Sequence, residues 1–397
     1  MSVYLDHAAT APMLPAAIQA YAEAMTVVGN PASIHSAGQN AKRMLEEARE
    51  RVAASVGSDP IEVVFTGSGT ESVNLGIKGL YWARAPRTRI LVPGGEHHAT
   101  VDTVEWLAQQ ENAVVQWIPL DDLGRIDLTA LADAIASNPA DVALVTLLAA
   151  NNEVGTLQPV REVAALAAAH GIPVHVDAIS AYGHVPIDFA ALHRSGVSAL
   201  SVSAHKIGGP VGIGALVLSR TATVVPLIHG GGQQRQVRSG TQDVAAAVSF
   251  AVAATAMTGE LTAENARLRV LRDAVIDGVR AAVPSAVLNG DPDPAGRLPG
   301  NAHFTFPGCE GDSLLFLLDV AGVSVSTGSA CQAGIPEPSH VLRAMGRSAA
   351  EARSALRITL GRTSTPADVE ALLTALPAAW SQAIGAGMAD SAPRAYT

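Results

Sequence analysis

The chain of 397 residues carries 36 acidic and 26 basic side chains, which gives a formal net charge of -10 at pH 7. This balance, without any clustered Lys/Arg stretch, argues against a surface for nucleic acid or for an anionic membrane. Hydrophobic residues make up 48% of the chain, so we expect a globular protein with one large domain and a smaller one.

The chain contains two cysteines, Cys309 and Cys331, so no disulfide framework is needed and a reducing cytoplasm is the expected location. The first residues, Met-Ser-Val-Tyr-Leu-Asp-His, lack the basic and apolar regions of a signal peptide. No apolar run approaches the roughly 20 residues that span a bilayer. We therefore expect a cytoplasmic protein whose partners are small molecules or proteins, with no nucleic acid and no membrane among them.

Short β-branched runs alternate with helical stretches, beginning near residue 61. The runs expected to form buried strands are 61–65, 89–92, 114–118, 142–147, 174–177, 199–203 and 214–218. A turn at 66–71 leads from the first of them into a helix beginning near Ser72. The clearest helix runs from Pro159 to Gly171, between a starting proline and a terminating glycine. This alternation predicts an α/β domain with a mostly parallel sheet.

The last third of the chain has a different pattern. We place a domain boundary near residue 258, in an Ala-rich helical region, and expect a strand at 301–306, a helix at 314–318 and a final helix from Pro366. The expected organisation is a large domain of residues 13–258 and a smaller α+β domain formed by 1–12 and 259–385. Residues 386–397, rich in small residues, are expected to form a flexible tail.

Four polar residues follow predicted strands, where ligands bind in open α/β sheets. These residues are Thr70, Asn152, Asp177 and Lys206. Lys206 lies between an apolar strand and a glycine turn, and removal from water favours the neutral amine that can hold an aldehyde cofactor as a Schiff base. A carboxylate such as Asp177 can pair with a protonated pyridine nitrogen.

The turn Thr66-Gly-Ser-Gly-Thr-Glu71 supplies backbone N–H groups at a helix start, which suits a phosphate. Taken alone, an ordinary capped helix is the more frequent explanation of this turn, and a strand-end turn is the more frequent explanation of Asp177. No Walker lysine follows, which disfavours a nucleoside triphosphate. The combination of these parts, rather than any single one, predicts the site.

Ordered blocks along nearly the whole chain resemble the cysteine desulfurases of the class V aminotransferase family, which are pyridoxal phosphate enzymes of fold type I. The blocks are Tyr4-Leu-Asp-His-Ala-Ala-Thr, Phe65-Thr-Gly-Ser-Gly-Thr-Glu-Ser, Glu96-His-His-Ala, Asn151-Asn-Glu-Val-Gly, His175-Val-Asp-Ala, His205-Lys-Ile-Gly-Gly-Pro, Arg238-Ser-Gly-Thr, Ser329-Ala-Cys and Leu356-Arg-Ile-Thr-Leu-Gly.

The resemblance implies roles for individual residues around pyridoxal 5'-phosphate. Lys206 would be the Schiff-base lysine and Asp177 the pyridine partner. The phosphate would be held by Gly69, Thr70, Ser203 and His205, and by Thr241 from the other subunit of a homodimer.

The same resemblance implies that His97 stacks on the cofactor ring as an acid/base, and that Asn152 and Arg357 bind the substrate carboxylate. Imidazole titrates near neutral pH, and a guanidinium grips a carboxylate with two hydrogen bonds. Without the surrounding motifs, a buried structural histidine and an ion-paired arginine would be the better explanations. The adjacent His98 has no set of metal ligands at suitable spacing around it, so no metal is expected.

One position departs from the family pattern. Where the family usually has a glutamine that hydrogen-bonds the phenolic oxygen of the cofactor, this chain has Ser180, whose shorter hydroxyl needs a water to reach as far. Ser180 is kept as a cofactor-binding candidate.

Cys331 decides which reaction is expected. It lies among small residues with glycines on both sides, which is typical of a mobile loop able to carry a thiolate, whereas Cys309 is either a small buried hydrophobe or an exposed bystander. In the resembled family this cysteine takes the sulfur of L-cysteine as a persulfide, releases L-alanine and passes the sulfur to an acceptor protein, and the long loop matches the iron-sulfur assembly type. The alternatives are a selenocysteine lyase, another lyase or aminotransferase using the same cofactor, and a cofactor-free binding protein.

Overall fold

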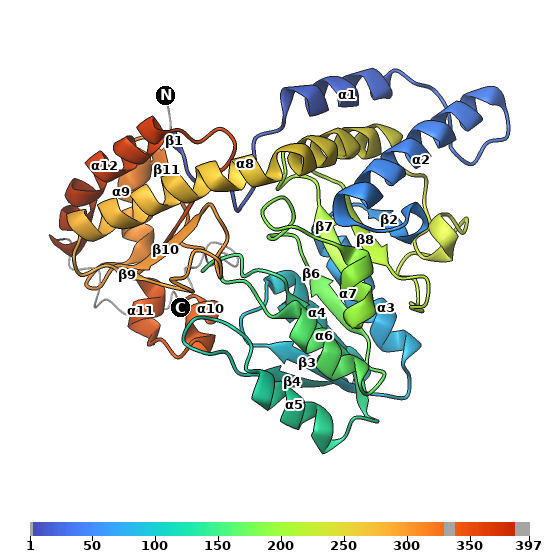
Figure 1. Cartoon of the computed structure of the whole chain (residues 1–397), viewed down its shortest axis with the longest axis horizontal. Helices are drawn as coiled ribbons and strands as arrows, with labels where there is room; N and C mark the ends of the chain where they lie inside the picture. Colours follow the sequence, from blue (N-terminus) through green and yellow to red (C-terminus); the bar gives the residue numbers. More distant parts are fainter. Residues whose placement is uncertain (1–2, 329–337, 386–397) are drawn as a thin grey trace, which may run out of the picture.

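The central sheet of the larger lobe has seven strands in the order β2-β8-β7-β6-β5-β3-β4. In this computed structural model, which describes residues 3–328 and 338–385, the sheet lies on the right of the molecule (Figure 1). Neighbouring strands pair in parallel, except that β8 is antiparallel to both β2 and β7. The strands are β2 (Val63–Thr66), β3 (Arg89–Pro93), β4 (Val114–Ile118), β5 (Val142–Leu148), β6 (Val174–Asp177), β7 (Val197–Ser203) and β8 (Gly214–Leu218).

Helices cover both faces of this sheet, so β5, β6 and β8 are buried along their whole length. One face packs on α3 and α4, and the other on α2 and α5 to α8. The helices are α1 (Pro15–Met25), α2 (Ser36–Val56), α3 (Gly69–Ala83), α4 (His98–Glu111), α5 (Leu128–Ser137), α6 (Val160–Ala168) and α7 (Phe189–Ser195), with short 3-10 turns at Pro60–Glu62 and Gln234–Gln236.

The smaller lobe has its own core around a three-stranded antiparallel sheet in the order β12-β10-β9. The N-terminal β1 (Val3–Tyr4) pairs in parallel with β11 (Val323–Ser324), which brings Leu5 into the core of this lobe. The remaining elements are β9 (Val287–Leu288), β10 (Asn301–Thr305), β12 (Ala355–Thr359), α9 (Gly311–Val320), α10 (His340–Ala344), α11 (Ala349–Arg353) and α12 (Pro366–Gly385).

The helix α8 (Val244–Ala282) joins the lobes and contributes to both cores (Figure 1). Phe250 and Met257 belong to the core of the larger lobe, and Leu268 and Val275 to that of the smaller lobe. The helix therefore runs unbroken through residue 258, where we place the domain boundary.

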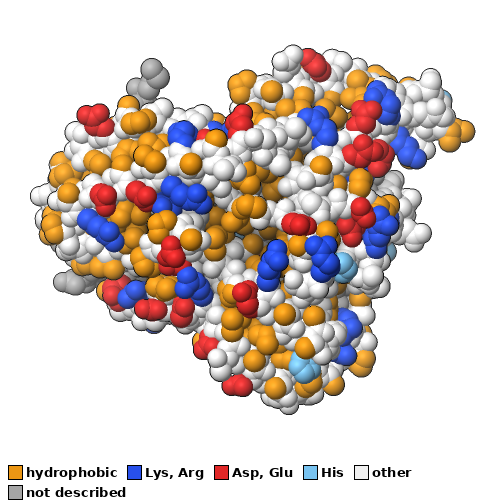
Figure 2. Space-filling model, in the orientation of Figure 1, with side chains coloured by type: hydrophobic (Ala, Val, Ile, Leu, Met, Phe, Trp, Pro, Cys, Tyr) orange, Lys and Arg blue, Asp and Glu red, His pale blue; other side chains and the backbone are white. Residues whose placement is uncertain are grey.

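By length and composition alone, α8 is apolar enough to cross a membrane, so the expectation that no apolar run approaches that length is wrong. Close to half of its apolar window, 44%, is buried inside the fold, and the helix packs against α1 and α2. A core helix of a globular protein passes the same test. Figure 2 shows acidic and basic side chains interspersed on the visible face of the molecule.

The α/β class and the mostly parallel sheet are confirmed, and β4, β6 and β8 have the bounds expected from the sequence. The helix α3 begins earlier than expected, at Gly69 rather than near Ser72, because the Ser68 hydroxyl accepts a hydrogen bond from the Glu71 N–H at 3.0 Å and caps the helix. Residues 61 and 62 belong to a 3-10 turn closed by a capping box between Asp59 and Glu62, so the strand starts at Val63.

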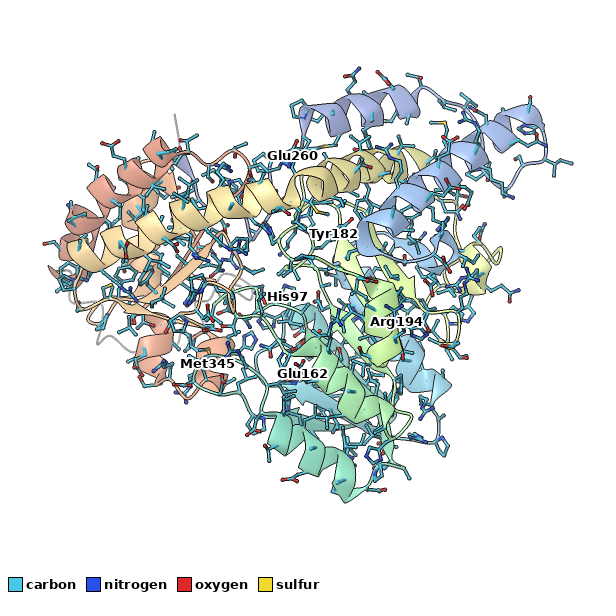
Figure 3. The ribbon with its side chains drawn as sticks, in the orientation of Figure 1. His97, Glu162, Tyr182, Arg194, Glu260 and Met345 are labelled. Carbon is cyan, nitrogen blue, oxygen red and sulfur yellow. The ribbon has the colours of Figure 1, made fainter. Side chains whose placement is uncertain are left out.

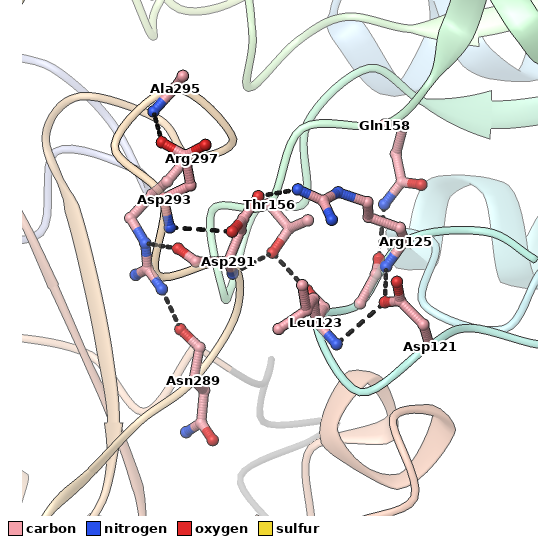
Figure 4. A network of polar contacts seen from close by, with 11 residues as sticks. Asp121, Leu123, Arg125, Thr156, Gln158, Asn289, Asp291, Asp293, Ala295 and Arg297 are labelled. Atoms are coloured by element: carbon pink, nitrogen blue, oxygen red, sulfur yellow. Dashed lines mark hydrogen bonds and ion pairs between the residues drawn. The ribbon is translucent and has the colours of Figure 1, made fainter.

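A polar network fastens the turn after β5 to the smaller lobe (Figure 4). Thr156 donates to the Leu123 carbonyl at 2.6 Å and accepts from the Asp291 N–H at 3.1 Å. Asp291 is buried, forms an ion pair with Arg125, and accepts at its carbonyl from Arg297 at 2.7 Å. These contacts hold residues of the two lobes together beside the cavity described next.

Candidate active site

A cavity of about 420 Å³ lies between the lobes, at the carboxyl ends of the parallel strands. Figure 3 shows His97 at this junction. The four strand-end candidates meet here, because Thr70 follows β2, Asn152 follows β5, Asp177 ends β6 and Lys206 follows β7. Other residues that line the cavity include Gly69, Ser180, His205, Glu153, Ser326, His340 and Arg357.

The start of α3 forms one end of the cavity. Ser68, Gly69 and Thr70 line it, and the first N–H groups of a helix have no partners within the helix. A Cβ on Gly69 would lie 2.5 Å from the Ile179 Cδ1 atom and 3.1 Å from the Ser203 Cβ atom. Ser203 therefore packs behind Gly69 rather than lining the cavity, and this end suits an anion such as a phosphate.

Lys206 lines the cavity. Its ammonium donates a 2.6 Å hydrogen bond to the Ala8 carbonyl, in the segment that follows β1. Burial lowers the pKa of Lys206 to about 8, assisted by the Arg357 guanidinium and opposed by the carboxylates of Asp177 and Asp6. About a tenth of the amine is therefore neutral and nucleophilic at pH 7, far more than for a lysine with the ordinary pKa.

Asp177 is buried, with 2% of its surface exposed, and accepts a hydrogen bond from the Ile179 N–H at 2.9 Å. Burial raises the pKa of this carboxyl to about 6, against the opposing effects of that hydrogen bond and of Lys206. A cation placed beside Asp177 would favour the carboxylate and bring the pKa down again. The environment thus suits a positively charged partner such as a protonated pyridine.

His97 caps α4, since its Nδ1 atom accepts from the Ala99 N–H at 3.0 Å. Burial, together with the nearby positive charge of Lys206, lowers the pKa of His97 to about 4. The ring is therefore neutral at physiological pH. Because Nδ1 accepts, the proton lies on Nε2, so Nε2 is a hydrogen-bond donor. Because Nδ1 is already occupied by the Ala99 N–H, the acid/base role expected for His97 is restricted to donating a hydrogen bond from Nε2.

His205 also lines the cavity, and its Nδ1 atom lies 3.2 Å from the Thr10 hydroxyl. Burial lowers the pKa of its imidazole, with Lys206 acting in the same direction. Ser180 is 9% exposed and lines the cavity three residues after Asp177, so the residue that departs from the family pattern does face the site.

Asn152 and Arg357 meet across the lobe boundary. The Arg357 guanidinium donates from Nη1 to the Asn152 carbonyl and from Nη2 to an Asp6 carboxylate oxygen, both at 2.8 Å. The Arg357 Nε atom and the Asn152 Oδ1 atom are buried without a partner, so each retains hydrogen-bonding capacity for a ligand. A carboxylate can accept from the guanidinium and from the Nδ2 atom of Asn152, whereas the free Oδ1 atom accepts from a donor.

Among the described residues of the expected site, Ser203 and Thr241 do not line this cavity. Thr241 is exposed and does not line it, so its assignment to the site of a second subunit stays a prediction. Cys331 and the tail 386–397 lie outside the described residues. Cys309 is a buried core residue of the smaller lobe, where burial raises the pKa of its thiol to about 11.

Sequence reasoning missed several residues that shape the site. Asp6 and Ala8 contact Arg357 and Lys206, although both lie in a block that carried the family resemblance. Glu153 and His340 also line the cavity, and Glu153 lies within the block Asn151-Asn-Glu-Val-Gly. His98 pairs with Asp102 at 3.4 Å, and within residues 3–328 and 338–385 no group of three or more His, Cys, Asp or Glu side chains is arranged to hold a metal ion.

Comparison with known proteins agrees with this geometry. The aminotransferase class-V family model matches residues 3–372. An IscS-like cysteine desulfurase of Mycobacterium tuberculosis is 53% identical over 390 residues, covering 97% of this chain and 98% of that protein.

Solved structures agree as well. A NifS-like protein superposes with a TM-score of 0.87 at 32% identity, covering 96% of this chain and 100% of that one. A protein described as SspA in complex with cysteine superposes with a TM-score of 0.78 at 31% identity, covering 90% and 99% respectively. These matches confirm the predicted fold of the larger and smaller lobes. The chain belongs to the class-V aminotransferase family, in the group of its cysteine desulfurases.

Proposed function

We propose that this protein is a cysteine desulfurase, an enzyme that converts L-cysteine to L-alanine and transfers the sulfur to Cys331 as a persulfide. The observation that carries the proposal is a single cavity lined by Lys206, Asp177, His97 and Arg357, at the strand ends where the family places its cofactor. The 53% identity to a cysteine desulfurase supports the choice of reaction within the family.

The cavity fits pyridoxal 5'-phosphate. Gly69 and Thr70 at the start of α3 and His205 would hold the phosphate, whereas Ser203, the fourth predicted phosphate ligand, packs behind Gly69. Lys206 would bind the aldehyde carbon, and Ser180 lies on the wall where the phenolic oxygen is expected. When bound, the cofactor supplies an electron sink that makes the Cα proton of the substrate acidic and the C–S bond weak.

The protein's own residues supply the remaining chemistry. Arg357 and Asn152 orient the substrate carboxylate, Asp177 keeps a cationic partner charged, and the neutral Lys206 amine moves the Cα proton. His97 donates a hydrogen bond from Nε2 to the substrate sulfur, which draws electron density from that sulfur and leaves it open to attack. The Cys331 thiolate then attacks the neutral substrate thiol: an S–S bond forms as the C–S bond breaks, the electron pair of the C–S bond stays with the β-carbon, that carbon takes a proton, and the skeleton leaves as L-alanine.

We further propose that the enzyme acts as a homodimer in which Thr241 of each subunit reaches the phosphate of the other. The persulfide is passed to an acceptor protein for iron-sulfur cluster assembly or other sulfur biosynthesis. The low cysteine content supports a cytoplasmic location.

One experiment tests substrate, product and nucleophile together. The purified protein is incubated with pyridoxal phosphate and L-cysteine, alanine is assayed, and mass spectrometry is used to locate added sulfur. We expect alanine and a mass increase on Cys331 that reducing agent removes. The Cys331→Ala variant should lose the persulfide, whereas Cys309→Ala, the matched control in the buried core, should keep it.

Other results would support different functions. Undiminished alanine and sulfide release from the Cys331→Ala variant would favour another lyase, and a strong preference for selenocysteine would favour a selenocysteine lyase. A colourless protein that cannot take up pyridoxal phosphate would contradict the proposal and favour a cofactor-free binding protein.

A further inference from the structure

The dipeptide Ser339-His340 at the start of α10 is hydrogen-bonded to Glu153 and Glu96, in two turns beside the cavity. Ser339 is fully buried, and its hydroxyl donates to a Glu153 carboxylate oxygen while it accepts from the Leu342 N–H at 3.1 Å as the cap of α10. His340 donates from Nε2 to the Glu96 carbonyl at 2.7 Å. Two adjacent residues of the smaller lobe are therefore hydrogen-bonded to two separate turns of the larger lobe.

Each of those turns carries a residue of the proposed site. Glu153 directly follows Asn152, and Glu96 directly precedes His97. Both glutamates are buried, with 1% and 2% of their surface exposed. His340 binds the backbone carbonyl of Glu96, one peptide unit from His97, and Ser339 binds the side-chain carboxylate of Glu153, the residue next to Asn152, so a shift of either glutamate displaces its neighbour.

Each glutamate has a second hydrogen bond. A Glu96 carboxyl oxygen accepts from the Leu148 N–H of β5, in the larger lobe, at 2.9 Å, and the Glu153 carbonyl accepts from the Asn301 side chain of β10, in the smaller lobe, at 2.9 Å. The His340 ring also packs edge-to-face on His98, with 4.9 Å between ring centroids. His340 therefore contributes a hydrogen bond and a ring contact to the turn that carries His97.

An apolar cluster fixes α10 itself against the larger lobe. Val341, Leu342 and Met345 pack with Val154 and the partly buried Leu120. Figure 3 shows Met345 at the lower edge of the smaller lobe, beside α10. This packing does not involve the side chains of Ser339 or His340, so the helix keeps its apolar contacts when their polar contacts are removed. Removing the Ser339 hydroxyl also removes the cap of α10, which a threonine at this position keeps.

We propose that Ser339 and His340 are positioning residues with separable roles, Ser339 acting on Asn152 through Glu153 and His340 acting on His97 through Glu96. The inference rests on the proposed function, in which Asn152 binds the substrate and His97 donates to its sulfur. A contact that sets substrate binding changes KM, and a contact that sets a group acting during the reaction changes kcat.

The kinetic test compares Ser339→Ala and His340→Ala with rescue variants that keep the hydrogen bond, Ser339→Thr and His340→Gln. Arg343→Ala, an exposed position on the same helix, is the control. We expect Ser339→Ala to raise the KM for L-cysteine roughly fivefold with kcat nearly unchanged, and His340→Ala to lower kcat roughly tenfold with KM nearly unchanged. The rescue variants should recover most of each loss.

A second readout does not depend on turnover. Amide hydrogen exchange should rise in residues 94–101 for His340→Ala and in residues 150–156 for Ser339→Ala, and in neither for Arg343→Ala. If the wild-type protein makes no alanine from L-cysteine, the proposed function fails, and the exchange pattern still decides whether the two contacts hold these turns. Identical exchange and kinetics in the two alanine variants, or variants that behave like Arg343→Ala, would overturn the inference.

Discussion

The Arg357 guanidinium, on a strand of the smaller lobe, donates a 2.8 Å hydrogen bond to the backbone carbonyl of Asn152, in a turn of the larger lobe. The same guanidinium binds Asp6, in the segment after β1. Three segments that are far apart in the sequence thus meet at one planar cation. The relative placement of the two lobes therefore decides whether a substrate carboxylate can be bound.

We expect Arg357→Lys to raise the KM for L-cysteine about tenfold, because a lysine keeps the charge but not the planar fork that holds Asn152, Asp6 and a carboxylate at once. The measurement is steady-state alanine formation at varied L-cysteine. The matched control is Arg353→Lys, whose guanidinium pairs with Glu310 at 3.6 Å outside the site. A wild-type KM for Arg357→Lys would contradict the carboxylate-binding role.

We expect cofactor uptake by the cofactor-free protein to speed up as the pH rises through about 8, the pKa of Lys206. Only the neutral amine attacks an aldehyde, and burial brings the neutral form to a lower pH than the ordinary value of 10.5. The growth of visible absorbance after mixing with pyridoxal phosphate measures the rate. Asp6→Asn should move the midpoint lower, since the Asp6 carboxylate raises the pKa of Lys206. A midpoint above pH 10 would refute this explanation.

We expect Gly69→Ala to weaken pyridoxal phosphate binding about tenfold. The added methyl group would meet the Ile179 Cδ1 atom at 2.5 Å and push that side chain, which lines the cavity, toward the bound phosphate. Cofactor titration of the cofactor-free protein is the measurement. The double variant Gly69→Ala with Ile179→Val removes the clashing Cδ1 atom and should recover most of the affinity. No recovery would mean that the methyl group acts on the helix start rather than through Ile179.

We expect buried His175 to make the protein less stable as the pH falls from 6.5. Its ring bridges Thr146 and Ser201, both at 2.9 Å, and burial lowers its pKa from 6.5 to about 3. The unfolded chain therefore binds a proton below pH 6.5 that the folded protein does not, so the stabilisation is complete above 6.5 and is lost as the pH falls toward 3.

This proton uptake costs about 1.4 kcal/mol of unfolding free energy at pH 5.5. Urea unfolding at pH 7.5 and 5.5 measures the difference. In His175→Gln the loss between the two pH values should be smaller by about that amount, whatever the variant's stability at pH 7.5. An unchanged pH dependence in this variant would contradict the pKa shift.

The positions of the buried strands along the chain could be predicted because a parallel strand covered on both faces is mostly apolar, as β5 is. The ends of helices were less predictable. A single side-chain hydrogen bond, such as Ser68 to Glu71, moves a helix start by several residues. The role of α8 was also not predictable from composition alone. Its composition fits a membrane span, but its residues are buried in the cores of both lobes.

The sequence by itself determined the chemistry that is available: a lysine and an aspartate at strand ends, a glycine turn before a helix, and the family blocks around them. Only the tertiary structure decided which atoms face one another. It placed the Ala8 carbonyl on Lys206, Asp6 and Asn152 on Arg357, and the dipeptide Ser339-His340 between two glutamates. The physical reason is that local patterns follow from hydrogen bonding and burial within one element, whereas these contacts join segments whose distance is set by the packing of two cores.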